Sequence, residues 1–305
     1  MEIQLDQSTT PFDLEHTLRC GQLFQWEKRG DWWYGVVGEM VVKIRQINDR
    51  LVFQTFPEEV DADFIKNYFR LDDNLPLILS KIDKDGHVRR AIQRFRGLRI
   101  SRQEPWECLI SYICATYKNI PAIKNMILNL SKRFGEKINF NSHYFYTFPK
   151  PSDLAHAGLE EIKECKLGFR AERVLEASKI VDRGEFNLEG LRKTDYEKAK
   201  RELLSLPGVG QKVADCVLLF SLDKLEAFPV DIWMKRIILG FYQNYFGASF
   251  VERVLGKSSI TPGEYETISS FGRRYFGEYA GYAQEYLFPL SRSQGKLVAL
   301  DSCNR

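Results

Sequence analysis

The sequence predicts an α+β protein, with an N-terminal antiparallel β-sheet domain followed by a larger all-helical body. Two observations support this fold class. Up to about residue 56, runs of aromatic and β-branched residues alternate with short polar turns, which is typical of a hairpin meander. From about residue 75 to 290, apolar residues recur at the spacing of amphipathic helices. A chain of 305 residues is long enough for two or three domains.

The N-terminal elements follow from local patterns. Residues 11–20 predict a short helix for which Asp13 is a suitable N-cap. Strand-like runs are predicted at residues 22–26, 32–37, 40–47 and 51–56. After them, residues 60–71 carry one apolar helical stripe. We assign residues 1–100 to this domain.

The helical body is predicted over residues 101–292. Pro105 stands at a position favoured near the start of a helix, and Gly135 is a suitable C-cap for the next one. Residues 139–155 read as a loop that enters another helix. Further helices are expected within 161–181, 195–206, 231–242 and 277–288. Residues 293–305 are expected to form a polar tail.

Composition excludes several classes of protein. No run of about 18 apolar residues is present, so we expect no membrane span. The six cysteines show no CxxC spacing, which speaks against a zinc site. Reduced thiols fit a cytoplasmic protein, nucleoid-associated if the source is prokaryotic.

An arginine-rich run spans residues 88–102, with six arginines and no acidic residue. Arginine suits phosphate contact. A solvated helix face followed by a linker explains the run equally well. Because the net charge of the whole chain is only +3, composition does not decide between these interpretations.

The segment LPGVGQKVADC, residues 206–216, predicts a tight hairpin between two helices, within about 199–222. Gly208 and Gly210 permit positive φ and close approach of another molecule. Amides at the start of the second helix would then form an anion site for a DNA phosphate. The alternative is a glycine-capped helix pair inside an ordinary core.

Lys212 lies on the first turn of that second helix, four residues before Cys216, so the two share one face. A partly desolvated amine there could attack a sugar C1′ and form a Schiff base. Simple neutralisation of a phosphate is an equal alternative from the hairpin alone. Asp231 follows 19 residues after Lys212 and suits the N-cap of the next helix. A rigid carboxylate could also stabilise an oxocarbenium-like centre, so the pair indicates a base-excising enzyme.

These residues resemble those of the helix-hairpin-helix superfamily of DNA glycosylases. Further stretches are similar to 8-oxoguanine DNA glycosylase/lyases of the eukaryotic type: RCGQLFQW at 19–26, YFRLD at 68–72, RQEPWECLISYIC at 102–114 and GYAQEYLF at 281–288. The resemblance covers about residues 12–290. It implies that Lys212 is the Schiff-base nucleophile and Asp231 the catalytic aspartate.

The resemblance also implies a pocket for the flipped base. The carbonyl of Gly21 would accept the N7 hydrogen of 8-oxoguanine, which guanine lacks. Cys216 and Phe288 would sandwich the base, and Gln284 would read its Watson–Crick edge. Gln284 and Phe288 are four residues apart, so one helical face can present both.

This chain departs from the family pattern where it would face DNA. Tyr117 replaces the first asparagine of an "NNN" segment, and Ala122 stands where an arginine should read the orphaned cytosine. A second such arginine is kept as Arg170, after Phe169, while Trp233 replaces a frequent histidine. These changes put reading of the opposite base in doubt.

The resemblance therefore predicts excision of 8-oxoguanine from duplex DNA through a lysine Schiff base, followed by β-elimination at the abasic strand. We expect no cofactor or metal, a monomer, and DNA containing 8-oxoguanine as the partner. The alternatives are another helix-hairpin-helix glycosylase, for oxidised pyrimidines or alkylpurines, and a non-catalytic helix-hairpin-helix DNA-binding protein. The pyrimidine type commonly carries a four-cysteine iron–sulfur loop near its C-terminus, where this chain has only Cys303.

Overall fold

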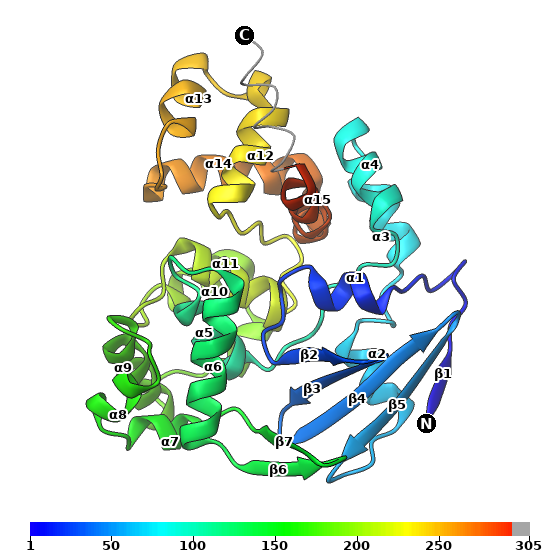
Figure 1. Cartoon of the computed structure of the whole chain (residues 1–305). Helices are drawn as coiled ribbons and strands as arrows, with labels where there is room; N and C mark the ends of the chain where they lie inside the picture. The colour runs from blue at the N-terminus through cyan, green and yellow to red at the C-terminus, as the bar shows by residue number, and fades with distance from the viewer. Residues whose placement is uncertain (295–305) are drawn as a thin grey trace.

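The computed structural model describes residues 1–294, and the sheet and the helical body follow in the predicted order (Figure 1). One antiparallel sheet has the strand order β1-β5-β4-β3-β2. Its strands are β1 (Glu2–Gln4), β2 (Trp26–Arg29), β3 (Trp32–Val37), β4 (Met40–Ile47) and β5 (Arg50–Phe56). The turns of the meander contain Gly30, Gly38 and Asn48, all at positive φ. The predicted antiparallel meander is confirmed.

The first strand of the meander lies later in the sequence than predicted. Strand β2 begins at Trp26, and residues 22–25 form no strand. The buried side chain of Gln22 instead donates to the carbonyls of Thr17 (3.1 Å) and Arg99 (2.8 Å) and accepts from Ser101 N (2.8 Å). These bonds fasten the segment to a distant part of the chain, which outweighs its local preference for a strand. The short strand β1 was not predicted.

Two helices pack with the sheet around one core. Helix α1 (Leu14–Arg19) begins at the predicted N-cap Asp13, whose carboxylate accepts from His16 N at 2.7 Å. Helix α2 (Ala62–Tyr68) matches the predicted stripe. This core contains only residues between Ile3 and Leu71.

The helical body surrounds a second and larger core. Its main helices are α3 (Leu75–Ile82), α4 (Gly86–Arg94), α5 (Pro105–Cys114), α6 (Ile120–Phe134), α7 (Pro151–Ala155), α8 (Leu159–Glu164), α9 (Arg170–Asp182), α10 (Tyr196–Leu203), α11 (Gln211–Ser221), α12 (Ile232–Phe241), α13 (Ala248–Leu255), α14 (Pro262–Phe276) and α15 (Ala280–Gln294). Three 3₁₀ turns connect them, at Glu189–Lys193, Gln243–Tyr245 and Gly277–Tyr279. By packing, α3 and α4 belong to this body, although they precede the predicted boundary at residue 100.

The body is not entirely helical, which corrects the predicted loop at 139–155. Strands β6 (Lys137–Phe140) and β7 (His143–Tyr146) form a hairpin. Asn141 and Ser142, the two residues of its turn, both have positive φ, as a tight hairpin turn requires. Ile138 and Phe145 of this hairpin share a small core with three residues of the first sheet. The hairpin therefore links the two parts of the molecule.

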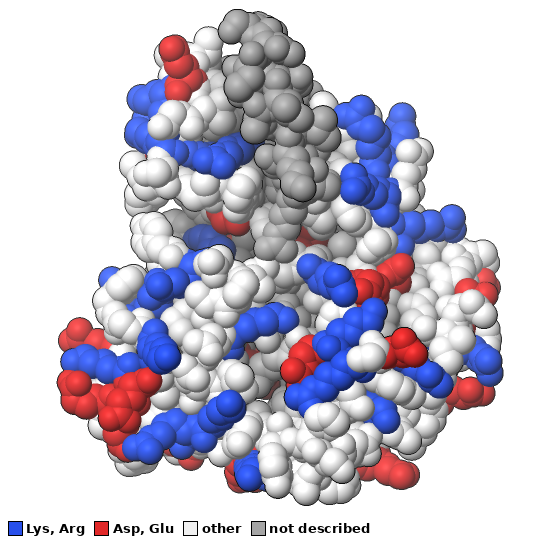
Figure 2. All heavy atoms as spheres, in the orientation of Figure 1, with Lys and Arg blue, Asp and Glu red and all other residues white. Residues whose placement is uncertain are grey.

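The arginines of residues 88–102 fall into two groups: two are bonded within the fold, and four are exposed. Arg99 is fully buried and donates to the carbonyls of Pro11, Arg70 and Asp73. Arg102 forms ion pairs with Asp72, Asp73 and Asp223. These two side chains join parts of the fold and are unavailable as a DNA surface. Arg89, Arg90, Arg94 and Arg96 remain exposed, and Figure 2 shows basic side chains gathered over α3 and α4.

The predicted tail begins inside a helix, because α15 continues to Gln294. Residues 295–305 lie outside the described part. Within residues 1–294, no helix is long and apolar enough to cross a bilayer. Cys20, Cys108, Cys114, Cys165 and Cys216 are free and buried.

Candidate active site

The predicted hairpin is present between α10 and α11. Gly208 has φ +84°, and a Cβ placed there would lie 3.0 Å from Arg173 and 3.3 Å from Ile113. Gly210 is the N-cap of α11, and open space surrounds the place where its Cβ would be. A glycine cap offers no side-chain acceptor, so the first amides of α11 are available to an outside anion.

A cavity of about 950 Å³ lies beside this hairpin, between α5, α11, α12 and α15. Its lining includes nine of the eleven residues proposed from sequence: Gly21, Tyr117, Gly208, Gly210, Lys212, Cys216, Asp231, Gln284 and Phe288. Phe169 and Arg170 are not among its lining residues. The fold thus brings residues from distant parts of the sequence to one cavity.

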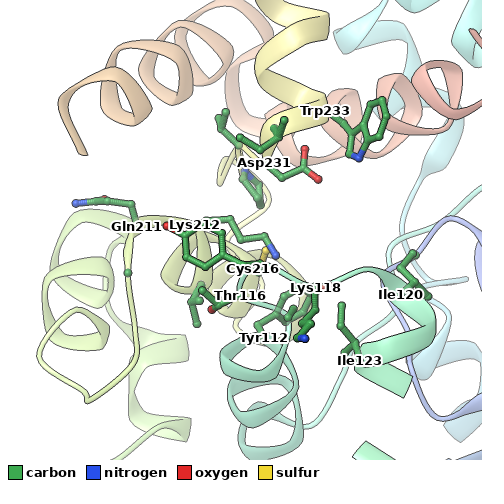
Figure 3. Close-up of a pocket in the computed structure, with 18 of the residues that line it drawn as sticks. Tyr112, Thr116, Lys118, Ile120, Ile123, Gln211, Lys212, Cys216, Asp231 and Trp233 are labelled. Atoms are coloured by element: carbon green, nitrogen blue, oxygen red, sulfur yellow. The ribbon is translucent and has the colours of Figure 1, made fainter. Parts of the chain in front are cut away.

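Lys212 and Asp231 enter the cavity from two different helices. In Figure 3, Lys212 projects from α11 beside Cys216, and Asp231 lies across the cavity at the start of α12. Asp231 is the predicted N-cap of α12, and its Oδ1 accepts from Met234 N at 2.7 Å. That bond holds the carboxylate rigidly at the rim.

Tyr112 of α5 forms part of the cavity wall below the lysine, and sequence reasoning did not find it. Lys212 Nζ lies 4.8 Å from the centre of the Tyr112 ring, a distance at which the ring face attracts a cation. Burial raises the pKa of the Tyr112 phenol well above its usual range, so the ring stays neutral. Tyr112 lies within an apolar helical run, and only the packing of α5 against α11 places it here.

Three predicted base-binding residues have features that suit a planar ligand. Gly21 has φ +111°, a conformation that other residues rarely adopt. The side chain of Gln284 is only 6% exposed, and its Oε1 has no hydrogen-bond partner within the structure. A buried acceptor without a partner is costly, and Gln284 is also one of the residues that line the cavity. Cys216 is buried beneath the same cavity.

Tyr117 and Phe169 both project from the surface. Tyr117 is 83% exposed at φ +54°, and Phe169 is 56% exposed immediately before α9. Trp233, on the first turn of α12, is also exposed and lines the cavity. Tyr117 and Trp233 thus leave large apolar side chains exposed at the cavity, as is common at interaction surfaces.

Arg170 is placed differently from the sequence-based expectation. It is 3% exposed, its Nε and Nη2 donate to the Thr116 carbonyl, and its Nη1 donates to the Leu167 carbonyl. Its guanidinium also lies 4.3 Å from the centre of the Phe169 ring. In this arrangement Arg170 braces the loop that carries Tyr117, and three of its five N–H groups donate to main-chain carbonyls.

Among residues 1–294, no group of three or more His, Cys, Asp or Glu side chains is placed to hold a metal ion. The chemistry available at the cavity is that of a primary amine, a fixed carboxylate and a side-chain amide. An amine can attack carbon, and a carboxylate can stabilise a developing cation.

Cys216 supplies a pH prediction. Burial raises the pKa of its thiol to about 12, although the charge of Lys212 opposes the shift. The folded state therefore favours the neutral thiol. The contribution of this thiol to the free energy of unfolding is fully present below about pH 9 and is lost between about pH 9 and 12. Unfolding in urea measures this effect. Between pH 8 and pH 10, the free energy of unfolding should fall by about 1.4 kcal/mol more in the wild type than in Cys216→Ala. An equal loss of unfolding free energy in both proteins would contradict the raised pKa of Cys216.

Known proteins are similar to this chain over most of its length. A family model described as the N-terminal domain of 8-oxoguanine DNA glycosylase matches residues 4–109. A probable N-glycosylase/DNA lyase of Methanothermobacter thermautotrophicus is 30% identical over 95% of this chain and 96% of its own. The N-glycosylase/DNA lyase of Saccharomyces cerevisiae is 31% identical over 90% of this chain and 82% of its own. The 8-oxoguanine glycosylase/lyase of Clostridium acetobutylicum, solved with double-stranded DNA containing cytosine opposite 8-oxoguanine, has a TM-score of 0.82 at 30% identity and covers 93% of each chain.

Proposed function

This chain belongs to the family of 8-oxoguanine DNA N-glycosylase/DNA lyases, and from that membership we propose a role for each side chain of the cavity. The protein is a bifunctional enzyme that binds DNA, excises 8-oxoguanine and cleaves the resulting abasic strand. The observation that carries the residue assignments is the convergence of Lys212, Asp231 and Gln284 on the lining of one cavity.

Base removal begins with extrusion of the nucleotide, since the glycosidic bond is out of reach inside the duplex. Lys212 Nζ then forms a bond to C1′, and the electron pair of the C1′–N9 bond leaves with the base, which takes up a proton. Asp231 stabilises the positive charge that develops on the sugar. The amine adduct opens to a Schiff base, which permits loss of the C2′ proton and of the 3′-phosphate.

Recognition of the base rests on one hydrogen that guanine lacks. The carbonyl of Gly21 accepts the N7 hydrogen of 8-oxoguanine. Gln284, which lines the cavity, reads the Watson–Crick edge of the base through its side-chain amide. Cys216 and Phe288, which both line the cavity, hold the two faces of the ring.

Borohydride trapping tests this proposal as a whole. The wild type is incubated with a duplex that contains one 8-oxoguanine opposite cytosine, in the presence of borohydride, with an undamaged duplex as control. Reduction of a lysine imine joins protein and DNA covalently, so a lesion-dependent adduct of the summed mass is expected. Strand cleavage without any such adduct would overturn the lysine mechanism.

Relaxed selectivity for the opposite base follows from the departures in this chain. Ala122 offers no side-chain donor, and three of the five N–H groups of Arg170 donate to the Thr116 and Leu167 carbonyls. One bidentate contact provides about 1–3 kcal/mol of discrimination, so its loss should relax selectivity roughly tenfold to a hundredfold. Exposed Tyr117 can fill the space of the flipped base by stacking, which every base tolerates.

Single-turnover excision from four duplexes that differ only in the opposing base measures this selectivity. We expect excision opposite cytosine with modest losses opposite the other bases, and a stronger cytosine preference in Ala122→Arg. A preference for cytosine over adenine of several hundredfold in the wild type would contradict the prediction.

We also propose that the enzyme acts as a monomer, because the proposed machinery comes from one chain. Repair of chromosomal DNA supports the expectation of a cytoplasmic protein, associated with the nucleoid if the source is prokaryotic.

A further inference from the structure

A buried carboxylate that the mechanism does not use lies on the same helix as the proposed nucleophile. Asp215, on α11 three residues after Lys212, is 0% exposed. Its Oδ1 accepts from the Tyr196 hydroxyl at 2.6 Å, and its Oδ2 accepts from the Tyr265 hydroxyl at 2.6 Å. Lys200 Nζ, itself nearly buried, donates to the same Oδ2 at 3.2 Å.

This network joins three helices. Tyr196 and Lys200 belong to α10, Asp215 to α11 and Tyr265 to α14. A buried ion pair is seldom a net gain in stability compared with apolar packing, so its presence here calls for another explanation. A fully bonded polar cluster orients its members more narrowly than apolar contacts do.

The network extends to the segment that carries Asp231. The Tyr265 hydroxyl donates to Asp215 and accepts from Val230 N at 3.3 Å, and Val230 directly precedes Asp231. In parallel, Ser269 Oγ of α14 donates to the Phe228 carbonyl at 3.0 Å and lies 3.4 Å from Asp215 Oδ2. The backbone leading into Asp231 is thus bonded to side chains that the helix of Lys212 holds.

We propose that Asp215 and Tyr265 are positioning residues that set the place of Asp231 relative to Lys212. Asp215 lies on the same helix as Lys212. Tyr265, in the wall of the cavity, bonds to Asp215 and also to the backbone N–H of Val230, the residue before Asp231. The network thereby keeps the amine and the carboxylate at a set separation when a nucleotide enters between them. This inference rests on the roles proposed above for Lys212 and Asp231.

Tyr265→Phe removes the hydroxyl and keeps the ring. We expect single-turnover excision of 8-oxoguanine to fall about tenfold to a hundredfold, because a small misplacement of a catalytic group has effects of that size. Affinity for the lesion duplex should stay within about threefold. Trapping on a preformed abasic duplex should also stay within about threefold, since that step needs Lys212 and no longer needs base departure.

Tyr68→Phe is the matched control. Its buried hydroxyl accepts from Trp26 Nε1 at 3.0 Å, in the core of the sheet domain. This variant should lose comparable thermal stability and keep its excision rate. If Tyr265→Phe excises at the wild-type rate, or loses excision and abasic trapping equally, the positioning role is wrong.

Two further outcomes are informative. If Tyr265→Phe does not fold, Ser269→Ala tests the parallel link to Phe228 and should lower excision roughly two- to tenfold; an unchanged rate would overturn the proposal. A wild type that forms no trapped adduct would instead overturn the assignment of Lys212, so the two failures are distinguishable.

Discussion

Replacement of Lys212 by glutamine should abolish the borohydride-trapped complex and leave binding to lesion DNA largely intact. The amide has no basic lone pair to attack C1′, so no imine forms. Binding persists because the backbone amides at the start of α11 do not depend on that side chain. The expected loss of trapping is complete, while the dissociation constant for an 8-oxoguanine duplex should change by less than about tenfold, the scale of one lost phosphate contact.

Lys118→Gln is the control for lost charge. Lys118 lines the same cavity from the α5–α6 loop and is exposed. Its replacement removes one positive charge at the DNA side and should leave trapping intact. Denaturing gels of the borohydride reactions give the covalent yield, and binding titrations at the same salt concentration give the affinity. Trapping at a normal rate by Lys212→Gln would show that another amine is the nucleophile.

Asp231→Asn should slow base excision by about 10²–10³ while the fold is retained. Asparagine is as good an N-cap as aspartate, so the bond to Met234 N can be kept and α12 still begins at the same residue. The variant loses only the negative charge that stabilises the sugar cation, and loss of one such electrostatic group typically costs about 10²–10³ in rate. Single-turnover excision with enzyme in excess over a lesion duplex measures the step directly.

The matched control is Asp61→Asn. Asp61 is the N-cap of α2 and accepts from Phe64 N at 3.0 Å, in the sheet domain. Both variants exchange a capping carboxylate for an amide, so both should show similar small changes in thermal unfolding. Only Asp231→Asn should lose excision. An unaltered rate in folded Asp231→Asn would reduce this residue to its capping role.

Much of the fold and the pair at the centre of the site could be predicted from local pattern. The meander was visible because strand periodicity and turn residues alternate within a few positions, although its first strand was misplaced. Local backbone geometry explains why three positions could be identified: Gly208 has positive φ, and Gly210 and Asp231 are helix N-caps. Helical spacing places Cys216 on the same face as Lys212, and its predicted role in holding the base comes from the family resemblance.

The predictions that went wrong share one physical cause. Gln22 has the local preferences of a strand, yet its side chain bonds to Thr17, Arg99 and Ser101. Arg99 looks like a surface cation in the sequence, yet main-chain carbonyls of Pro11, Arg70 and Asp73 accept from its guanidinium group. Sequence composition does not reveal which carbonyls will be left without partners elsewhere.

Local sequence patterns thus predict the sheet followed by helices, the hairpin, and Lys212 and Asp231 as candidate residues, while their catalytic roles come from the family resemblance. Features that depend on contacts between distant segments are visible only in the folded chain. The tertiary structure placed Tyr112 beneath Lys212, left Gln284 Oε1 without a partner, and joined Asp215 to Val230 through Tyr265. This difference arises because backbone preferences act over one or two turns, whereas hydrogen bonds and burial depend on which surfaces the folded chain brings together.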